Sequence, residues 1–200
     1  MTTPIEFFFD FSSPYAYFAS VSIEALAGRV GRSVVFKPIL LGPAFKASGN
    51  IPLMKQPLKG PYSAHDWARM GRYHGIPWVL PDPFPIATMA AGRAFYWLDS
   101  RDPALAKEFA HVAYRTYFGH GIDITDKEVV AKIAAPLGID RTQLLAAVQD
   151  DVWKNRLREE TEKAVERGVF GAPFFLVDGE PFWGCDHLGM MEEWIKKGGW

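Results

Sequence analysis

Cysteine is nearly absent from this sequence. Cys185 is the single cysteine among 200 residues, so no disulfide can form within one chain, and a cysteine-built metal site is disfavoured. A single cysteine also cannot cycle an internal dithiol, which argues strongly against a dithiol oxidoreductase. The low cysteine content fits a reducing compartment, and we expect a cytoplasmic protein.

Strong net charge and long apolar runs are missing as well. A formal net charge of −1 gives no electrostatic reason to expect nucleic acid or an anionic membrane surface as a partner. No uninterrupted apolar stretch approaches the ~20 residues of a membrane helix. Glu6 and Asp10 interrupt the first apolar run, so we expect no signal segment there. An apolar fraction of 48% over 200 residues instead predicts one globular domain, with or without an insertion.

Several motifs of metal and nucleotide chemistry do not occur. The sequence contains no G-x-G-x-x-G, no P-loop and no G-x-S-x-G. Glu108 and His111 have the spacing of a di-iron ligand pair, but no second such pair exists, so we expect no metal. Aromatic residues are abundant, with 15 Phe and 7 Trp. They indicate either deep aromatic packing or an apolar pocket, and composition does not distinguish these two.

The first forty residues predict a strand, a helix and a second strand. "IEFFFDF" is nearly continuously apolar, as strands buried on both faces are. Pro14 suits the first turn of a helix, where its missing N–H costs nothing. "RSVVFKPIL" gives the second strand, which Pro38 should end. The result is a βαβ unit with a right-handed crossover.

The middle of the sequence predicts mainly helices. Residues 42–61 are rich in Gly, Pro and Lys and are expected to form a long loop. Residues 77–88 hold four prolines and should be irregular. Helical patterns then continue to about residue 167, with capping boxes that start helices at Thr125 and Asp140.

The last part of the sequence returns to strands. "APFFLVDGEPFW" predicts a hairpin that turns at Asp178-Gly179, and "DHLGMMEEWIKK" predicts a final amphipathic helix. A βαβ unit and a ββα unit therefore bracket a helical block. This order predicts an α/β protein with a discontinuous thioredoxin-like domain (residues 1–40 and 166–200) and an inserted helical domain (residues 41–165).

Ser13 stands at the start of the first predicted helix. Serine is among the best N-cap residues, so a purely structural role explains it. In a thioredoxin-like fold, however, this place carries the reactive Cys-x-x-Cys, whose thiolate the helix N-terminus stabilises. Ser13 and Ala16 occupy both cysteine positions, which removes disulfide exchange. What remains is a hydroxyl donor at an anion-favouring helix start, suited to a thiolate that another molecule supplies.

Two further segments are expected near this helix start. We predict a cis Ala172-Pro173 bond, because in this architecture the residue before that proline pairs its backbone with the substrate peptide. Asp186 is predicted to N-cap the last helix, where its carboxylate can also meet a ligand's ammonium group. Cys185 is expected to pack beside the pocket as an inert thiol.

Five stretches carry a family resemblance: "FDFSSPYAYFA", "ILLGPAFKASGNIP", "LKGPY", "GVFGAPFFLVDGEPFWG" and "CDHL". Together they make the chain resemble 2-hydroxychromene-2-carboxylate isomerases and kappa-class glutathione transferases, which share a DsbA-like architecture. The resemblance implies glutathione as cofactor or co-substrate, a homodimer, and an aromatic small molecule as substrate. It also implies site residues: Ser13 beside the glutathione sulfur; Asn50, Pro57, Ala172, Trp183, Gly184, Cys185 and Asp186 as glutathione contacts; Phe45, Lys46 and Phe84 as substrate contacts.

Two residues depart from the family pattern. Cys185 stands where relatives usually have Ser or Asn, which changes any side-chain hydrogen bond there. His187 replaces a common Arg, so a fixed positive charge becomes pH-dependent.

Three functions are compatible with this resemblance. In the first, a glutathione-dependent isomerase, a thiolate adds to a conjugated carbon of an aromatic enone acid and is expelled after bond rotation, with Lys46 or Lys59 near the substrate carboxylate. In the second, a kappa-type transferase or peroxidase, glutathione is consumed. In the third, a non-catalytic protein binds glutathione or a peptide without turnover.

Overall fold

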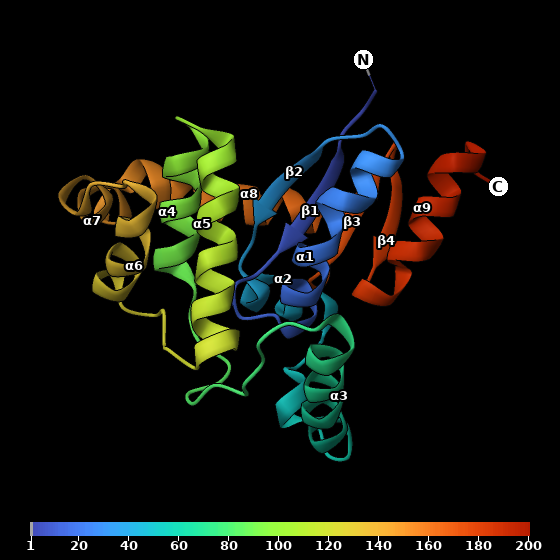
Figure 1. Cartoon of the computed structure of the whole chain (residues 1–200), viewed down its shortest axis with the longest axis horizontal. Coiled ribbons are helices and arrows are strands. Elements are labelled where there is room, and N and C mark those ends of the chain that lie inside the picture. The colour runs from blue at the N-terminus through green and yellow to red at the C-terminus, as the bar shows by residue number, and fades with distance from the viewer. Residues whose placement is uncertain (1) are drawn as a thin grey trace.

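A small mixed sheet lies at the centre of the protein, whose computed structural model describes residues 2–200 (Figure 1). The strands are β1 (Ile5–Phe9), β2 (Val34–Pro38), β3 (Phe174–Val177) and β4 (Glu180–Trp183). They lie in the order β2-β1-β3-β4, with β1 parallel to β2 and antiparallel to β3. The central strand is thus the apolar run near the start of the chain. Its neighbours come from opposite ends of the sequence.

Helices surround this sheet. They are α1 (Pro14–Arg29), α2 (Leu41–Ser48), α3 (Lys59–His74), α4 (Met89–Asp99), α5 (Pro103–Tyr114), α6 (Lys127–Ala134), α7 (Arg141–Gln149), α8 (Asp151–Glu166) and α9 (Leu188–Lys197). In Figure 1, α1 and α9 lie with the sheet, α4 to α7 form a block to its left, and α3 projects below. The predicted α/β fold, with a helical insertion between a βαβ and a ββα unit, is confirmed. The domain boundaries at residues 40 and 166 stay a prediction.

The predicted long loop over residues 42–61 is wrong. It contains α2, a short 3₁₀ turn at Leu53–Lys55 and the start of α3. Gly42 and Pro43 lie in the first turn of α2, where neither removes an intrahelical hydrogen bond. No side chain next to it in sequence caps this helix; instead, its Leu41 N–H donates to the distant Asp10 carboxylate. A helix held by a long-range contact leaves no local start signal.

Three of the local predictions are confirmed and one is displaced by one residue. Residues 77–88 contain no helix or strand, and the hairpin turns at Asp178-Gly179. Asp140 N-caps α7 through the Gln143 N–H, as expected. The cap of α6 is Asp126 rather than Thr125, because the Asp126 carboxylate reaches the Glu128 N–H at 2.9 Å.

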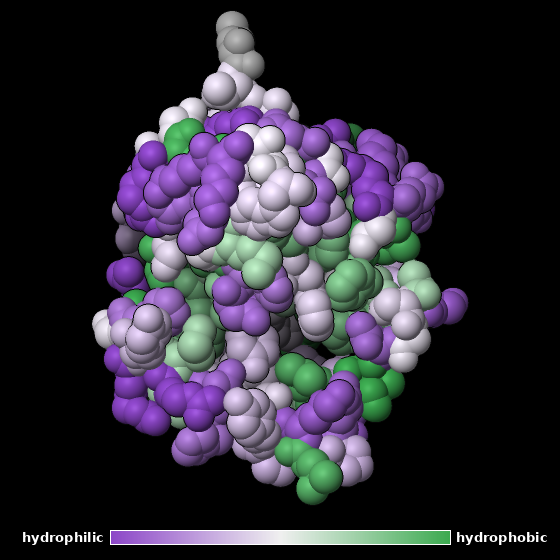
Figure 2. All heavy atoms as spheres, turned by 90° about the vertical axis from the view of Figure 1, so that its right-hand side faces the viewer, coloured by the Kyte–Doolittle hydropathy of each residue, from purple (hydrophilic) through white to green (hydrophobic). Residues whose placement is uncertain are grey.

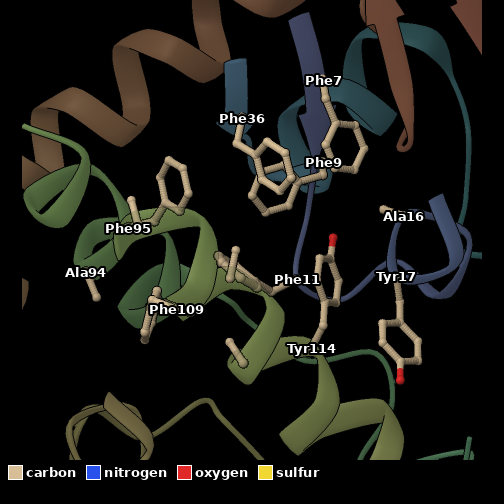
Figure 3. Close-up of a cluster of buried hydrophobic side chains, with 14 of the residues drawn as sticks. Phe7, Phe9, Phe11, Ala16, Tyr17, Phe36, Ala94, Phe95, Phe109 and Tyr114 are labelled. Carbon is tan, nitrogen blue, oxygen red and sulfur yellow. The ribbon is translucent and has the colours of Figure 1, made fainter. Parts of the chain in front are cut away.

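Aromatic side chains form most of the main core. Phe7 of β1 lies opposite Phe36 of β2 and Phe175 of β3, with ring centroids 5.1 and 5.2 Å apart. Phe9 continues this stack toward Tyr114 (Figure 3). The alternate residue, Phe8, points to the other face of the sheet. The aromatic richness of the sequence is therefore largely explained by packing.

The helices are all too short or too polar to cross a bilayer, as far as residues 2–200 are concerned.

Replacing Phe9 by Ala should destabilise the protein by about 3–5 kcal/mol, because a fully buried ring at the junction of sheet and insertion is lost and leaves a cavity. Urea denaturation measures this. Tyr73→Ala is the matched control, since Tyr73 is 81% exposed and its loss should change stability by no more than about 0.5 kcal/mol. Equal effects of the two substitutions would contradict this account of the core.

Candidate active site at the start of α1

Ser13 caps α1 and touches a segment from the far end of the chain. Its Oγ accepts a hydrogen bond from the Ala16 N–H at 3.2 Å and donates one to the Ala172 carbonyl at 2.8 Å. The predicted N-cap is therefore confirmed. Ser13 is 4% exposed, and 159 residues separate it from its acceptor. The fold thus places the helix start directly against the strand that follows Ala172.

The first turn of α1 has one unused donor. Pro14 has no N–H, the Ala16 N–H bonds to Ser13 Oγ, and the Tyr17 N–H bonds to the Ser13 carbonyl. The Tyr15 N–H has no acceptor within residues 2–200. Together with the helix dipole, this free donor makes the start of α1 suited to an anion.

The buried carboxylate of Asp10 positions this helix start. One of its oxygens accepts from the Ser12 N–H and from the Thr88 hydroxyl, both at 2.8 Å. The other accepts from the Leu41 N–H, also at 2.8 Å. Asp10 therefore joins three segments: the loop that carries Ser13, the start of α2, and the residue before α4.

The backbone carbonyl of Asp10 also links the loop that carries Ser13 to the inserted helices. It accepts from the Ser13 N–H at 2.9 Å and from the Tyr114 hydroxyl of α5 at 3.0 Å. Burial raises the pKa of the Asp10 carboxyl above its ordinary value, while the donors from Ser12, Leu41 and Thr88 oppose that rise. The site loop is thus anchored to the inserted helices at a point closed to water.

The Ala172-Pro173 bond is cis, as predicted, and leads into β3 beside Ser13. The Pro173 carbonyl accepts from the Gly184 N–H at 3.0 Å, which brings the end of β4 to the same place. Trp183 is half exposed there, and its ring lies 5.0 Å from that of Phe170. Ser13, Ala172 and Gly184 are therefore neighbours in space, while their roles toward a ligand stay predictions.

Cys185 lies against the first turn of α1. Burial raises the pKa of its thiol to about 12, with a smaller contribution from the Asp186 carboxylate. Tyr15 and Asp66 lie close enough to Cys185 to influence its electrostatics, and the Tyr15 hydroxyl donates to Asp66 at 2.9 Å. Tyr15, Asp66 and Cys185 therefore lie together beside the start of α1.

The predicted N-cap role of Asp186 is wrong. Residues Cys185–His187 form a 3₁₀ turn, and His187 occupies the N-cap position of α9 without a side-chain cap. Because this turn leads into the helix, Asp186 lies outside the first turn and is mostly exposed. Its Oδ1 lies 3.5 Å from His187 Nδ1, an ion pair only when His187 is protonated.

The remaining predicted contacts lie on α2, on the segment after it and on the proline-rich loop. Asn50 and Pro57 are exposed between α2 and α3, and Lys46 is exposed on α2 beside the partly buried Phe45. No side-chain hydrogen bond within residues 2–200 links Asn50 or Lys46 to Ser13. Their assignment as ligand contacts stays a prediction.

Phe84 lies closer to the helix start. Its ring packs 5.5 Å from Trp67, and the nearby Ile86 N–H donates to Ser12 Oγ at 3.2 Å. The proline-rich loop is thus tied directly to the residue before Ser13.

Figure 2 shows the face of the molecule on the α9 side, where a hollow with apolar residues at its rim lies above α3. Two open hollows of about 560 and 460 Å³ lie elsewhere, the first between α4 and α8 and the second along the sheet beside Glu6, Val35 and Lys37. Neither contains Ser13 among its lining residues.

Sequence reasoning missed Asp10, Tyr15, Asp66 and Trp67 as parts of this site. One signal was present: Asp10 is a carboxylate inside an apolar run, directly before the two serines. A charged residue there is expected to be paired or hydrogen-bonded when buried. Asp66 and Trp67 carry no such signal, because α3 reaches the site only through tertiary packing.

A mixed four-stranded sheet, a cis-proline beside a helix start and the absence of a cysteine at that start define a thioredoxin-fold protein without the dithiol. The model of the DSBA-like thioredoxin domain matches residues 4–196, and the chain belongs to this family. The resemblance expected from the sequence is thereby confirmed.

The chain is also similar in sequence to individual proteins of known name. The chain is 31% identical over 203 residues to the 2-hydroxychromene-2-carboxylate isomerase of Sphingobium xenophagum, covering 98% of this chain and 99% of that protein. It is 29% identical over 212 residues to glutathione S-transferase kappa 2 of Caenorhabditis elegans, covering 96% of this chain and 92% of that protein.

A solved 2-hydroxychromene-2-carboxylate isomerase superposes with a TM-score of 0.88 at 28% identity, covering 98% of this chain and 95% of that structure. A probable DsbA oxidoreductase of Streptomyces coelicolor, at 17% identity and a TM-score of 0.81, shares the fold.

Asp10→Asn should lower the free energy of unfolding by about 2–3 kcal/mol, because an amide nitrogen replaces one of the two acceptor oxygens and leaves a buried donor unpaired. Urea denaturation gives this value. Asp99→Asn is the control: Asp99 is a half-buried carboxylate on α4 that accepts no hydrogen bond within residues 2–200. A loss no larger than that of the control would show that the Asp10 hydrogen bonds contribute little.

The Cys185 thiol should resist alkylation by iodoacetamide in the native protein at mildly alkaline pH. A thiol with a pKa of about 12 is almost fully protonated there, and the thiolate is the nucleophile. Because the chain has one cysteine, mass spectrometry reads the site directly. The unfolded protein in urea is the positive control; comparable rates in the native and unfolded states would refute the expectation.

Proposed function

We propose that this protein is a glutathione-dependent isomerase that interconverts the cis and trans forms of an aromatic enone acid, as a 2-hydroxychromene-2-carboxylate isomerase does. The observation that carries the proposal is the match to the Sphingobium xenophagum isomerase along nearly the whole of both chains. The local chemistry supports it, because Ser13 and a free backbone donor stand where a dithiol protein has its cysteines.

The residues at the start of α1 fit a thiolate ligand. The Tyr15 N–H has no acceptor within residues 2–200, and Ser13 Oγ lies at the same helix end. When bound, glutathione supplies a thiolate that adds reversibly to a conjugated carbon, so that the former double bond can rotate before the thiol leaves. The protein's part is to keep that sulfur ionised and to hold the substrate.

To donate a hydrogen bond to the sulfur, Ser13 has to give up the one it donates within the protein. A hydroxyl carries one proton, and that of Ser13 is donated to the Ala172 carbonyl. Turning it toward an anionic sulfur gains about 1.5–3 kcal/mol and gives up about 0.5–1.5 kcal/mol, a net gain of about 1 kcal/mol within a range of about 0–2.5 kcal/mol. The Ala172 carbonyl is then free to accept from the backbone of a bound peptide.

The helix start supplies the rest of the stabilisation. Lowering the pKa of a thiol by about two units, enough to ionise most of it near neutral pH, requires about 2.7 kcal/mol. A helix N-terminus contributes about 0.3–1 kcal/mol, and up to about 2 kcal/mol when partly buried. With about 1 kcal/mol from Ser13 the sum reaches the required size when the helix N-terminus contributes close to its upper value, and neither effect reaches it alone. Ser13 is therefore a thiolate stabiliser rather than a nucleophile.

A transferase that consumes glutathione is the second candidate, favoured by the kappa-class relative at 29% identity. Stoichiometry separates the two activities. The purified protein is assayed with 2-hydroxychromene-2-carboxylate, with and without glutathione. An isomerase gives glutathione-dependent turnover with total glutathione unchanged, whereas a transferase depletes it. Glutathione binding without turnover of any conjugated electrophile would favour the non-catalytic protein. The homodimer is part of the proposal and is tested by analytical ultracentrifugation.

Ser13→Ala should raise the pKa of bound glutathione by just under one unit, because the net gain of about 1 kcal/mol from the hydroxyl is lost. A pH titration of the ultraviolet thiolate absorbance measures the pKa. Asp140→Ala is the matched control, since it removes the N-cap of α7 and leaves the site intact. An unchanged thiol pKa in Ser13→Ala would remove Ser13 from the mechanism.

A further inference from the structure

The indole N–H of Trp67 is a buried donor without an acceptor among the described residues. Trp67 is 1% exposed, and its Nε1 has no acceptor within residues 2–200. Buried polar groups are nearly always hydrogen-bonded, and an unpaired donor away from water is costly. We therefore expect Trp67 Nε1 to donate a hydrogen bond to an acceptor that is not part of the described residues.

The surroundings of Trp67 belong to the proposed active site. Its ring lies 6.0 Å from Tyr15, which holds the free donor of the α1 start, and 5.5 Å from Phe84 in the proline-rich loop. Asp66, the preceding residue, accepts from the Tyr15 hydroxyl. Trp67 is therefore held between the helix start where the thiolate is proposed and the loop that carries a predicted substrate contact.

Packing fixes the position of the indole. Gly71, one helical turn later, lets Trp78 approach α3 so closely that a Cβ at residue 71 would lie 2.5 Å from the Trp78 Cβ. The Trp78 ring then lies 6.1 Å from that of Trp67. The N–H of Trp67 is thus presented by a rigid aromatic wall, as a positioning donor requires.

We propose that Trp67 Nε1 donates a hydrogen bond to a carboxylate or carbonyl oxygen of the bound aromatic substrate, and so selects conjugated acids over electrophiles without an acceptor oxygen. This inference rests on the proposed function, since it assigns a substrate contact at the same site. A site that offers a buried donor rejects ligands that leave it unpaired. A charged acceptor forms the stronger bond, which favours a carboxylate.

The test uses binding of two unreactive ligands of similar shape, so it does not depend on turnover. trans-Cinnamate carries a carboxylate, and trans-β-methylstyrene carries no acceptor oxygen. Trp67→Phe keeps an aromatic ring and removes the N–H. It should weaken cinnamate binding about tenfold and leave methylstyrene binding within about twofold. Trp97→Phe is the matched control, because it removes a buried indole on α4, outside this aromatic wall, and should leave the binding of both ligands unchanged.

A second measurement covers the case in which Trp67→Phe does not fold. In ¹⁵N-labelled wild-type protein, the indole N–H signal of Trp67 should move when cinnamate is added and should not move when methylstyrene is added. This signal is assigned by elimination, from Trp→Phe variants at the other six of the seven tryptophans.

Three results would overturn the inference: no binding of cinnamate, an unmoved Trp67 signal at saturation, or equal weakening of both ligands in Trp67→Phe. Glutathione calorimetry on the same samples separates the two proposals. Heat from glutathione together with failure of the cinnamate test removes Trp67 alone, whereas loss of both signals removes the proposed function as well.

Discussion

A single buried carboxylate holds the functional end of this molecule together. Asp10 accepts hydrogen bonds from the loop that carries Ser13, from the start of α2 and from Thr88 before α4. These segments are distant in sequence, and each donates a hydrogen bond to the same carboxylate. Because a buried charge is tolerated only when its acceptor positions are filled, the site and the junction with the inserted helices depend on each other. Loosening either one exposes the carboxylate.

Loss of cysteine changes the chemistry of this fold without changing its geometry. The helix start, the cis-proline and the adjoining β4 turn are all present. The one cysteine of the chain lies beside them as a partly buried thiol with a raised pKa, and a single thiol cannot replace a reactive dithiol. The free Tyr15 N–H and the helix dipole at this start then favour an anion that arrives with a ligand. This arrangement agrees with relatives that are isomerases and glutathione transferases rather than dithiol oxidoreductases.

Local signals account for what the sequence predicted well. Apolar strands, the hairpin dipeptide and Ser13 followed by Pro14 each act over a few residues, so the α/β order and the helix cap were correct. The error over residues 42–61 arose where a distant contact decides the structure. α2 starts on a hydrogen bond to Asp10, whereas its content of Gly, Pro and Lys predicted a loop and no local cap marks the helix. Trp67 and Asp66 join the site through the packing of α3, which sequence spacing does not encode.

The central claim is that a thiol becomes ionised when it binds at the α1 start. Isothermal titration calorimetry in buffers of different ionisation enthalpy counts the protons released on binding. With glutathione near neutral pH, the account predicts release of most of one proton per site, and with S-methylglutathione it predicts none. Binding of glutathione with no proton release, or with the same release as its S-methyl derivative, would contradict it.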